Sequence, residues 1–349
     1  MAMKLENFDP NGVGVDNGNY FGLPITPEEA DLVLISAPWD VTVSYGSGTA
    51  YAPDAMIEAS TQLDLYDLSA PDCWRRGIGT AAVDYSLQEL SERLRRDAER
   101  VIEHLEEGGS TEDDQVVRKI RRINEGCSEM NENIRRQALA WIEKGKLVGL
   151  VGGDHSTPYG LISALSGQHD SFGVLHIDAH CDLREAYEGF EYSHASIMHN
   201  VLRDVPQVER LVEVGVRDFC DREYERAQSD PRIEMFHDQA LARAAFEGCS
   251  WQDQCRRIIE KLPEKVYVSF DIDGLSPDNC PHTGTPVPGG LSFREAIFLL
   301  EELVRSKRRI IGFDVVEVTP KAEERIDEIV GARILYKLCN LTLHSNPVK

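Results

Sequence analysis

The segment from His176 to Asp182, with the sequence HIDAHCD, carries the residue types best suited to chemistry in this chain. It continues an apolar run, Phe172 to Leu175, which predicts a buried strand. Side chains two residues apart on an extended chain project to the same side, so we expect Asp178, His180 and Asp182 to converge. Two carboxylates and an imidazole suit a divalent metal ion. Alone, this pattern fits a strand end with solvated acids equally well.

Two further clusters of the same kind also follow apolar segments. His155 comes after residues 147–151 through a pair of glycines that allow a tight turn, and Asp271 and Asp273 come at the end of residues 266–270. The three clusters supply two imidazoles and four carboxylates, which is more than one ion needs, and carboxylates can bridge two ions. The sequence therefore predicts a binuclear centre. Its oxygen-rich donors favour Mn²⁺, with Ni²⁺ or Co²⁺ as alternatives.

The elements that must position these clusters alternate along the chain. Apolar segments predict strands at residues 31–36, 77–83, 147–151, 174–177, 212–216, 266–270 and 310–316. Helical spacing predicts helices at residues 54–62, 87–105, 112–144, 157–165, 195–202, 222–228, 251–261, 292–304 and 325–339. This alternation predicts an α/β fold whose mainly parallel sheet is flanked by helices on both faces. In such sheets ligands bind beyond the carboxyl ends of the strands, where all three clusters fall.

The bulk of the chain has the composition of one large domain. Its 349 residues are 42% hydrophobic and 28% charged, and no linker or internal repeat is visible. We therefore predict a single domain, residues 1–349, with an irregular lead-in at residues 1–30 and a charged helical region at about residues 86–146.

Charge, hydropathy and cysteine spacing argue against a nucleic-acid or membrane partner and against a secreted, disulfide-bonded protein. The net charge of -23, without a basic patch, argues against nucleic acid. No apolar run approaches a membrane span, and the N-terminus lacks the apolar region of a secretion signal. The eight cysteines include no C-x-x-C pair and predict reduced thiols. We expect a cytoplasmic protein without a membrane partner.

At four places the sequence resembles the ureohydrolase family of arginase and agmatinase. GGDHS at residues 152–156, DAHCD at 178–182 and SFDIDGLSPDNCPHTGTPVPGG at 269–290 match the family's three metal-binding signatures, and GFDVVEVTP at 312–320 matches its fourth conserved stretch. The likeness spans most of residues 31–339. It implies the three-layer α/β arginase fold, a binuclear manganese centre and a homo-oligomer, a trimer or hexamer.

The resemblance also assigns roles to individual residues. The six metal ligands would divide as follows: one ion is held by His155 and Asp182, the other by His180 and Asp273, and Asp178 and Asp271 bridge both.

Three more residues match positions in the family's active site. His194 corresponds to a proton-shuttling histidine, Glu317 to the glutamate that pairs with the substrate guanidinium, and Thr285 lies in a loop lining the site. With the bridging Asp178, His194 and Glu317 would form the catalytic group. A bridged pair of ions lowers the pKa of water toward ~7, Glu317 would orient the cation, and a histidine titrating near neutrality would protonate the leaving amine.

The identity of the guanidino substrate is less constrained. Arginases have asparagine two residues beyond the last aspartate of the DAHxD motif, whereas this chain has Arg184, a candidate substrate-binding residue that is expected to disfavour a second positive charge. The SHAS stretch at residues 193–196 is closer to agmatinases, but the loop at residues 44–55 (SYGSGTAYAPDA) lacks the arginine usual in agmatinases. The long helical region before GGDHS resembles a branch of the family that includes guanidine hydrolases.

We therefore predict an enzyme that acts on a small cationic guanidino compound. The first expectation is conversion of agmatine to putrescine and urea. The alternative is conversion of guanidine to urea and ammonia, followed by activity on arginine or guanidinobutyrate. Two other classes compete. An inactive metal-binding regulatory protein of the same fold would be expected to lose His194 or Glu317, and a two-metal phosphatase would need more basic groups near the site.

Overall fold

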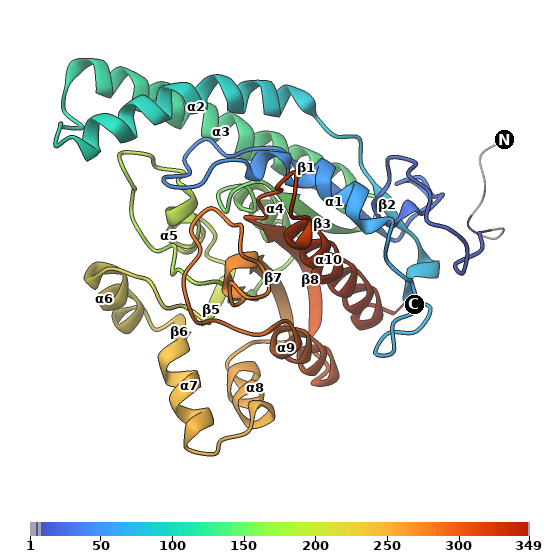
Figure 1. Cartoon of the computed structure of the whole chain (residues 1–349). Coiled ribbons are helices and arrows are strands. Elements are labelled where there is room, and N and C mark those ends of the chain that lie inside the picture. Colours follow the sequence, from blue (N-terminus) through green and yellow to red (C-terminus); the bar gives the residue numbers. More distant parts are fainter. Residues whose placement is uncertain (1–4, 6–7, 348–349) are drawn as a thin grey trace.

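A single eight-stranded sheet forms the centre of the computed structural model, which describes residue 5 and residues 8–347 (Figure 1). The strand order is β2-β1-β3-β8-β7-β4-β5-β6, and every pairing is parallel. The strands are β1 (Leu32–Ala37), β2 (Ile78–Thr80), β3 (Leu147–Gly152), β4 (Phe172–Ile177), β5 (Val208–Val214), β6 (Ile233–Phe236), β7 (Lys265–Asp271) and β8 (Arg309–Val316).

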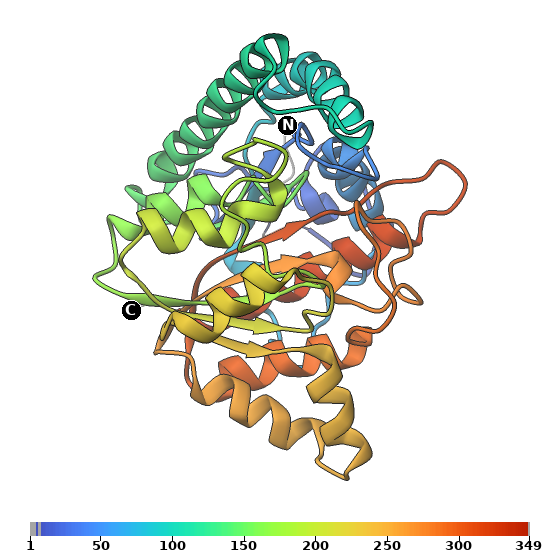
Figure 2. The same ribbon diagram turned by 90° about the vertical axis from the view of Figure 1, so that its left-hand side faces the viewer.

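Helices cover both faces of this sheet (Figure 2). They are α1 (Ala52–Ser60), α2 (Tyr85–Glu106), α3 (Asp114–Ile142), α4 (Tyr159–Ser166), α5 (Ile197–Asp204), α6 (Asp221–Ser229), α7 (Asp238–Phe246), α8 (Trp251–Glu260), α9 (Phe293–Arg305) and α10 (Ile326–Ser345). Leu32 and Leu34 of β1 belong to the buried cluster that includes residues of α1, α8, α9 and α10, whereas the alternate residues Val33 and Ile35 belong to the cluster that includes residues of α2, α3, α4 and α5. The predicted α/β fold is confirmed. Within the described part of the chain, no helix is both long enough and apolar enough to cross a membrane.

The charged helical region folds as a pair of long helices. α2 has 22 residues and α3 has 29, and they lie side by side along one edge of the molecule (Figure 1). Ile123, Cys127, Met130 and Ile134 of α3 recur every three or four residues and are fully buried, while much of the rest of the helix is charged and exposed. This amphipathic stripe joins the helical pair to the body of the protein.

Two elements were not predicted. Strand β6 and helix α7 fall between residues 229 and 250, where the sequence analysis placed no element. β6 has four residues at the sheet edge and only Ile233 is buried, so it lacks an apolar run. α7 buries only Leu241 and therefore shows no clear helical stripe.

The strand order places four carboxyl ends next to one another. β3, β8, β7 and β4 are adjacent, and their registers pair Val151 with Val315, Asp271 with Val316, and Ile177 with Phe270. Since the strands end at nearly the same level, the loops that follow them meet at one edge of the sheet.

Candidate metal centre

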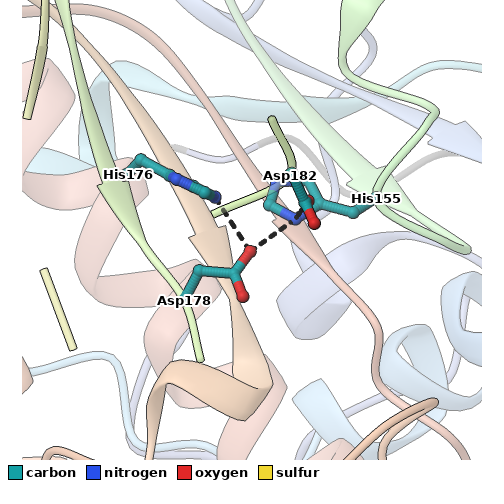
Figure 3. A group of neighbouring side chains, drawn as sticks. All are labelled: His155, His176, Asp178 and Asp182. Atoms are coloured by element: carbon teal, nitrogen blue, oxygen red, sulfur yellow. Dashed lines mark hydrogen bonds and ion pairs between the residues drawn. The ribbon is translucent and has the colours of Figure 1, made fainter. Parts of the chain in front are cut away.

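Three carboxylates converge on one ring nitrogen of His155. The Nδ1 atom lies 2.9 Å from Oδ2 of Asp178, 3.1 Å from Oδ2 of Asp182 and 3.1 Å from Oδ2 of Asp271. All four side chains are buried, and Figure 3 shows Asp178 and Asp182 turned toward the imidazole. One nitrogen cannot satisfy three carboxylates, so the geometry suits a shared cation.

A second cluster shares Asp178 with the first. Nδ1 of His180 lies 3.4 Å from Oδ1 of Asp178 and 3.2 Å from Oδ2 of Asp273. The two oxygens of Asp178 therefore face different imidazoles, Oδ2 toward His155 and Oδ1 toward His180. A carboxylate can bridge two ions in this way, with one oxygen directed toward each ion.

The donor atoms fit a pair of divalent ions. Nδ1 of His155 and Oδ2 of Asp273 are buried and lie within 2.9–3.2 Å of other site residues, but neither atom makes a well-formed hydrogen bond. The two clusters unite four carboxylates with two imidazoles, which leaves excess negative charge in a buried region. Oxygen and imidazole donors in this ratio are typical of Mn²⁺ and related ions.

The convergence arises from turns more than from strand alternation. Asp178 follows the last residue of β4, and Asp182 has a left-handed backbone with φ 52°. Asp271 ends β7, but Asp273 lies in a 3₁₀ turn, where its N–H donates to Oδ1 of Asp271 at 2.8 Å. The expectation that an extended chain aligns these pairs is therefore only partly correct.

Contacts behind the cluster fix the ring of His155. Its Nε2 lies 2.9 Å from the hydroxyl of Ser269, which donates a 2.9 Å hydrogen bond to Oδ2 of Asp314. All three groups are buried. Outer contacts of this kind orient a ligand imidazole so that its other nitrogen faces the metal.

His176 is a neighbour that the sequence analysis missed. Its Nε2 lies 2.8 Å from Oδ2 of Asp178 (Figure 3), and its Nδ1 lies 3.9 Å from Oε1 of the fully buried Glu213. Burial, followed by repulsion from Asp178 and Asp182, raises the pKa of Glu213 well above its usual value. The alternation of side chains along a strand could have indicated His176, because it precedes Asp178 by two residues and therefore projects to the same side.

The pKa values of the two predicted bridging acids, Asp178 and Asp271, are shifted in opposite directions. Burial opposes ionisation of Asp178 most strongly, but the imidazoles of His176, His155 and His180 hold its pKa well below the usual value. Burial, then repulsion from Asp273 and Asp178, raises the pKa of Asp271 well above its usual value. A bound cation would favour the ionised form of both.

Glu317 faces the cavity beside the cluster. The cavity has a volume of about 160 Å³, and its lining includes His155, Asp271, His194, Thr285 and Glu317. Glu317 follows β8, has φ 64°, accepts the backbone N–H of His155 through Oε1 at 2.8 Å, and leaves a buried Oε2 without a partner. Burial, then Asp154, raises its pKa well above the usual value.

His194 is held by Thr42, a residue from a distant loop. The backbone N–H of His194 donates to Oγ1 of Thr42 at 3.1 Å, and the same hydroxyl lies 3.5 Å from its Nδ1. Burial, then the nearby His180 and His155, lowers the pKa of His194 to about 3. This differs from the expected titration near neutrality. Its imidazole is neutral at pH 7, because the partly buried ring lies beside other basic groups.

Arg184 lies at the side of the same cavity. Its Nε is 3.6 Å from Oε2 of Glu223, and its guanidinium lies over the ring of Tyr187, 4.6 Å from the centroid. Asp218, Glu223 and Tyr187 also line the cavity. The positive charge of Arg184 therefore has a neighbouring counter-charge.

Arg217 braces the loop that carries Thr285. Its guanidinium donates to five backbone carbonyls, those of Gly215, Asp273, Leu275, Val287 and Pro288. The hydrogen bond to the Asp273 carbonyl is 2.7 Å. The sequence carried no signal for this role, since carbonyl acceptors leave no mark on side-chain patterns.

Known proteins resemble this chain both in sequence and in fold. The sequence profile of the arginase family matches residues 30–340. The chain is 31% identical over 323 residues to an N(1)-aminopropylagmatine ureohydrolase of Thermus thermophilus, covering 92% of this chain and 94% of that protein. It is 28% identical to an agmatinase of Pyrococcus horikoshii, covering 90% and 93%. The fold matches proclavaminate amidino hydrolase of Streptomyces clavuligerus with a TM-score of 0.72 at 24% identity, covering 94% and 97%.

Proposed function

Since this chain belongs to the arginase family and is a metal-dependent ureohydrolase, we propose that it releases urea from agmatine or a closely related cationic guanidino compound. The observation that carries this proposal is Oε2 of Glu317, which is buried without a partner in the cavity that also exposes His155 and Asp271. A guanidinium offers a planar fork of N–H donors that matches a carboxylate. Pairing with this cation would favour the ionised form of Glu317.

We propose one assignment of the metal ligands, which the contacts of His155, His180 and Asp178 support. One ion would be held by His155 and Asp182, the second by His180 and Asp273, with Asp178 and Asp271 between them. When bound, a pair of divalent ions supplies hydroxide at neutral pH by lowering the pKa of water. We propose Mn²⁺, with Ni²⁺ or Co²⁺ as alternatives, because oxygen donors predominate.

His194 would transfer a proton from the attacking water to the departing nitrogen of the substrate. Its Nδ1 lies near the hydroxyls of Thr42 and Ser193, at 3.5 and 3.3 Å, so Nε2 is the ring nitrogen left for the cavity. A neutral imidazole first accepts a proton from the attacking water and then delivers it to the departing nitrogen. His194 therefore acts as a relay that is neutral at the start of the cycle.

The part of the cavity lined by Asp218, Glu223 and Arg184 suits a second positive charge on the substrate, such as the distal ammonium group of agmatine. Two carboxylates, Asp218 and Glu223, line it together with one guanidinium, that of Arg184. Because Arg184 is close to Glu223, its charge is partly offset, and Asp218 remains to receive a distal ammonium group. This weakens the reason for expecting Arg184 to repel agmatine. A direct contact of Arg184 or Thr285 with substrate stays a prediction.

Guanidine is the second candidate substrate. The cavity volume of about 160 Å³ is small compared with typical ligand pockets, and a substrate without a tail needs no partner beyond Glu317. An inactive regulatory protein is less favoured, because both His194 and Glu317 line the cavity.

Urea release from a substrate panel tests the proposal. The panel comprises agmatine, N(1)-aminopropylagmatine, guanidine, arginine and guanidinobutyrate, assayed with protein reconstituted separately with Mn²⁺ and Ni²⁺. We expect the highest kcat/KM for agmatine or its aminopropyl derivative. The Asp218→Asn variant should raise KM for agmatine and leave KM for guanidine unchanged. Turnover of guanidine alone would replace the proposed substrate, and failure to release urea from any member would refute the proposal.

The family resemblance also predicts a trimer or hexamer, which stays a prediction. Sedimentation of the metal-loaded protein would measure the number of subunits.

A further inference from the structure

Helix α2 reaches the catalytic edge of the sheet although it belongs to the charged helical region. Two residues one turn apart on α2, Ser91 and Arg95, contact the loop that follows β1. In both ribbon views this loop lies beneath the α2–α3 pair (Figures 1 and 2). The charged helical region therefore contacts a loop that reaches the cavity.

Arg95 holds this loop through its backbone. The guanidinium donates to the carbonyl of Val41 at 3.2 Å and to the carbonyl of Val43, while its Nε pairs with Glu99 at 3.2 Å. The side chain of Arg95 is only 14% exposed. Because both carbonyls are fixed by one rigid planar group, the residue between them, Thr42, has little freedom.

Ser91 provides a second attachment for the same loop. Its hydroxyl accepts the backbone N–H of Asp40 at 3.1 Å and donates to the carboxylate of Asp40 at 3.3 Å. The other carboxylate oxygen of Asp40 accepts the N–H of Gly48 at 2.9 Å. The two ends of the loop are thus tied to one another and to α2.

The loop transmits this restraint to His194. Thr42 is fully buried, and its Oγ1 accepts the backbone N–H of His194 at 3.1 Å. Farther along the loop, Ser44 lines the cavity, and the N–H of Gly46 donates to the carbonyl of Gly284, next to Thr285. The loop after β1 therefore connects α2 with two segments that line the cavity.

We infer that Arg95 is a positioning residue for catalysis, which sets the place of the His194 ring through Val41, Thr42 and Val43. This inference rests on the proposed function, because it assigns a purpose to the location of His194. It gives the charged helical pair a functional role, namely holding the loop after β1 in the geometry that proton transfer needs. Small displacements of a catalytic group are costly, about 10²-fold per ångström.

Hydrogen–deuterium exchange of the metal-loaded protein tests the positioning independently of activity. The Arg95→Met variant keeps the apolar stem and removes the donors, and Arg96→Met, at an exposed position of the same helix, is the matched control. We expect faster exchange in peptides covering residues 40–48 and 193–196 for Arg95→Met and no change for Arg96→Met. If Arg95→Met does not fold, Arg95→Lys should give the same two changes at smaller amplitude. Unchanged exchange in both segments would overturn the inference.

Kinetics on two backgrounds then tests whether Arg95 acts through His194. In the wild-type background, Arg95→Met should lower kcat at least 10-fold, with both ions still bound and KM for agmatine within 2-fold. In a His194→Ala background the same substitution should leave kcat unchanged. An equal loss in both backgrounds would contradict the inference. If His194→Ala alone keeps full turnover, the relay assigned to His194 fails, and the exchange result separately decides whether Arg95 positions the loop.

Discussion

The backbone N–H of His155 donates a 2.8 Å hydrogen bond to Oε1 of Glu317, across 162 residues of sequence. The residue assigned to a metal ion and the residue assigned to the guanidinium are therefore directly linked. Because the bond uses only one oxygen of Glu317, the other remains in the cavity. The metal ligand His155 and the carboxylate of Glu317, which is assigned to the substrate guanidinium, therefore hold each other in position.

Replacing Glu317 by glutamine should separate binding of substrate from binding of metal. The glutamine side chain would keep an oxygen for the N–H of His155 but lose the charge that pairs with a guanidinium. Removing one partner of a buried charge pair costs about 2–5 kcal/mol, so kcat/KM should fall roughly 30-fold or more. Metal content by mass spectrometry should stay at two ions. The exposed Glu323→Gln is the control, and an unchanged kcat/KM for Glu317→Gln would remove Glu317 from substrate binding.

Asp271→Asn should weaken the binuclear centre itself. Asp271 lies 3.1 Å from Nδ1 of His155 and is assigned to both ions, so the variant should bind fewer than two ions per chain and lose activity. Addition of Mn²⁺ should raise Tm less than in the wild-type protein, since ligand binding stabilises the folded state. Metal analysis and calorimetry measure both effects. The exposed Asp278→Asn should behave as wild type, and two retained ions in Asp271→Asn would refute the bridging assignment.

His176→Gln distinguishes a metal ligand from a supporting contact. The Nε2 of His176 lies 2.8 Å from Oδ2 of Asp178, so we expect it to orient this carboxylate from behind. Loss of such a contact costs about 10–100-fold in metal affinity, whereas the number of ions at saturation should remain two. Competition with a metal indicator gives the affinity. A saturation value of one ion would instead make His176 a ligand.

The pH dependence of turnover should not have an acidic limb from His194. Burial and neighbouring imidazoles lower the pKa of His194 to about 3, so the ring is neutral in the resting enzyme at pH values well above 3 and carries a proton only transiently during turnover. His194→Ala should therefore lower kcat by about 10²–10⁴-fold. Any midpoint in the dependence of kcat on pH between pH 5 and 9 should stay at the same pH in the variant. Parallel pH–rate profiles of both proteins test this. A midpoint near pH 6.5 that disappears in the variant would show that His194 titrates near its ordinary value.

The sequence predicted those parts of the site that depend on local order. His155, Asp178 and Asp271 follow long apolar runs, and in a parallel sheet such runs end at one edge, so their convergence could be expected. β6 escaped prediction because only one of its four residues is buried. The shape of the turn at Asp273 was also hidden, since a 3₁₀ turn and an extended segment can carry the same residues.

Properties that depend on distant neighbours could not be predicted. The pKa of His194 follows from burial beside His180 and His155, which only the folded chain reveals. The contacts of Arg95 and Arg217 are to backbone carbonyls, and carbonyls are present at every position. Sequence patterns therefore located the ligands but not the groups that hold them.

Two of the site acids, Asp182 and Glu317, have left-handed backbones, with φ 52° and 64°. Glycine or asparagine adopts this conformation readily, whereas a β-branched residue does not. Substitution libraries at these two positions should therefore yield few folded proteins with β-branched residues, and more with glycine, asparagine or the unbranched acids and amides. New substrate specificity is therefore more accessible through pocket residues with ordinary backbone angles, such as Ser44 and Thr285, than through these two acids.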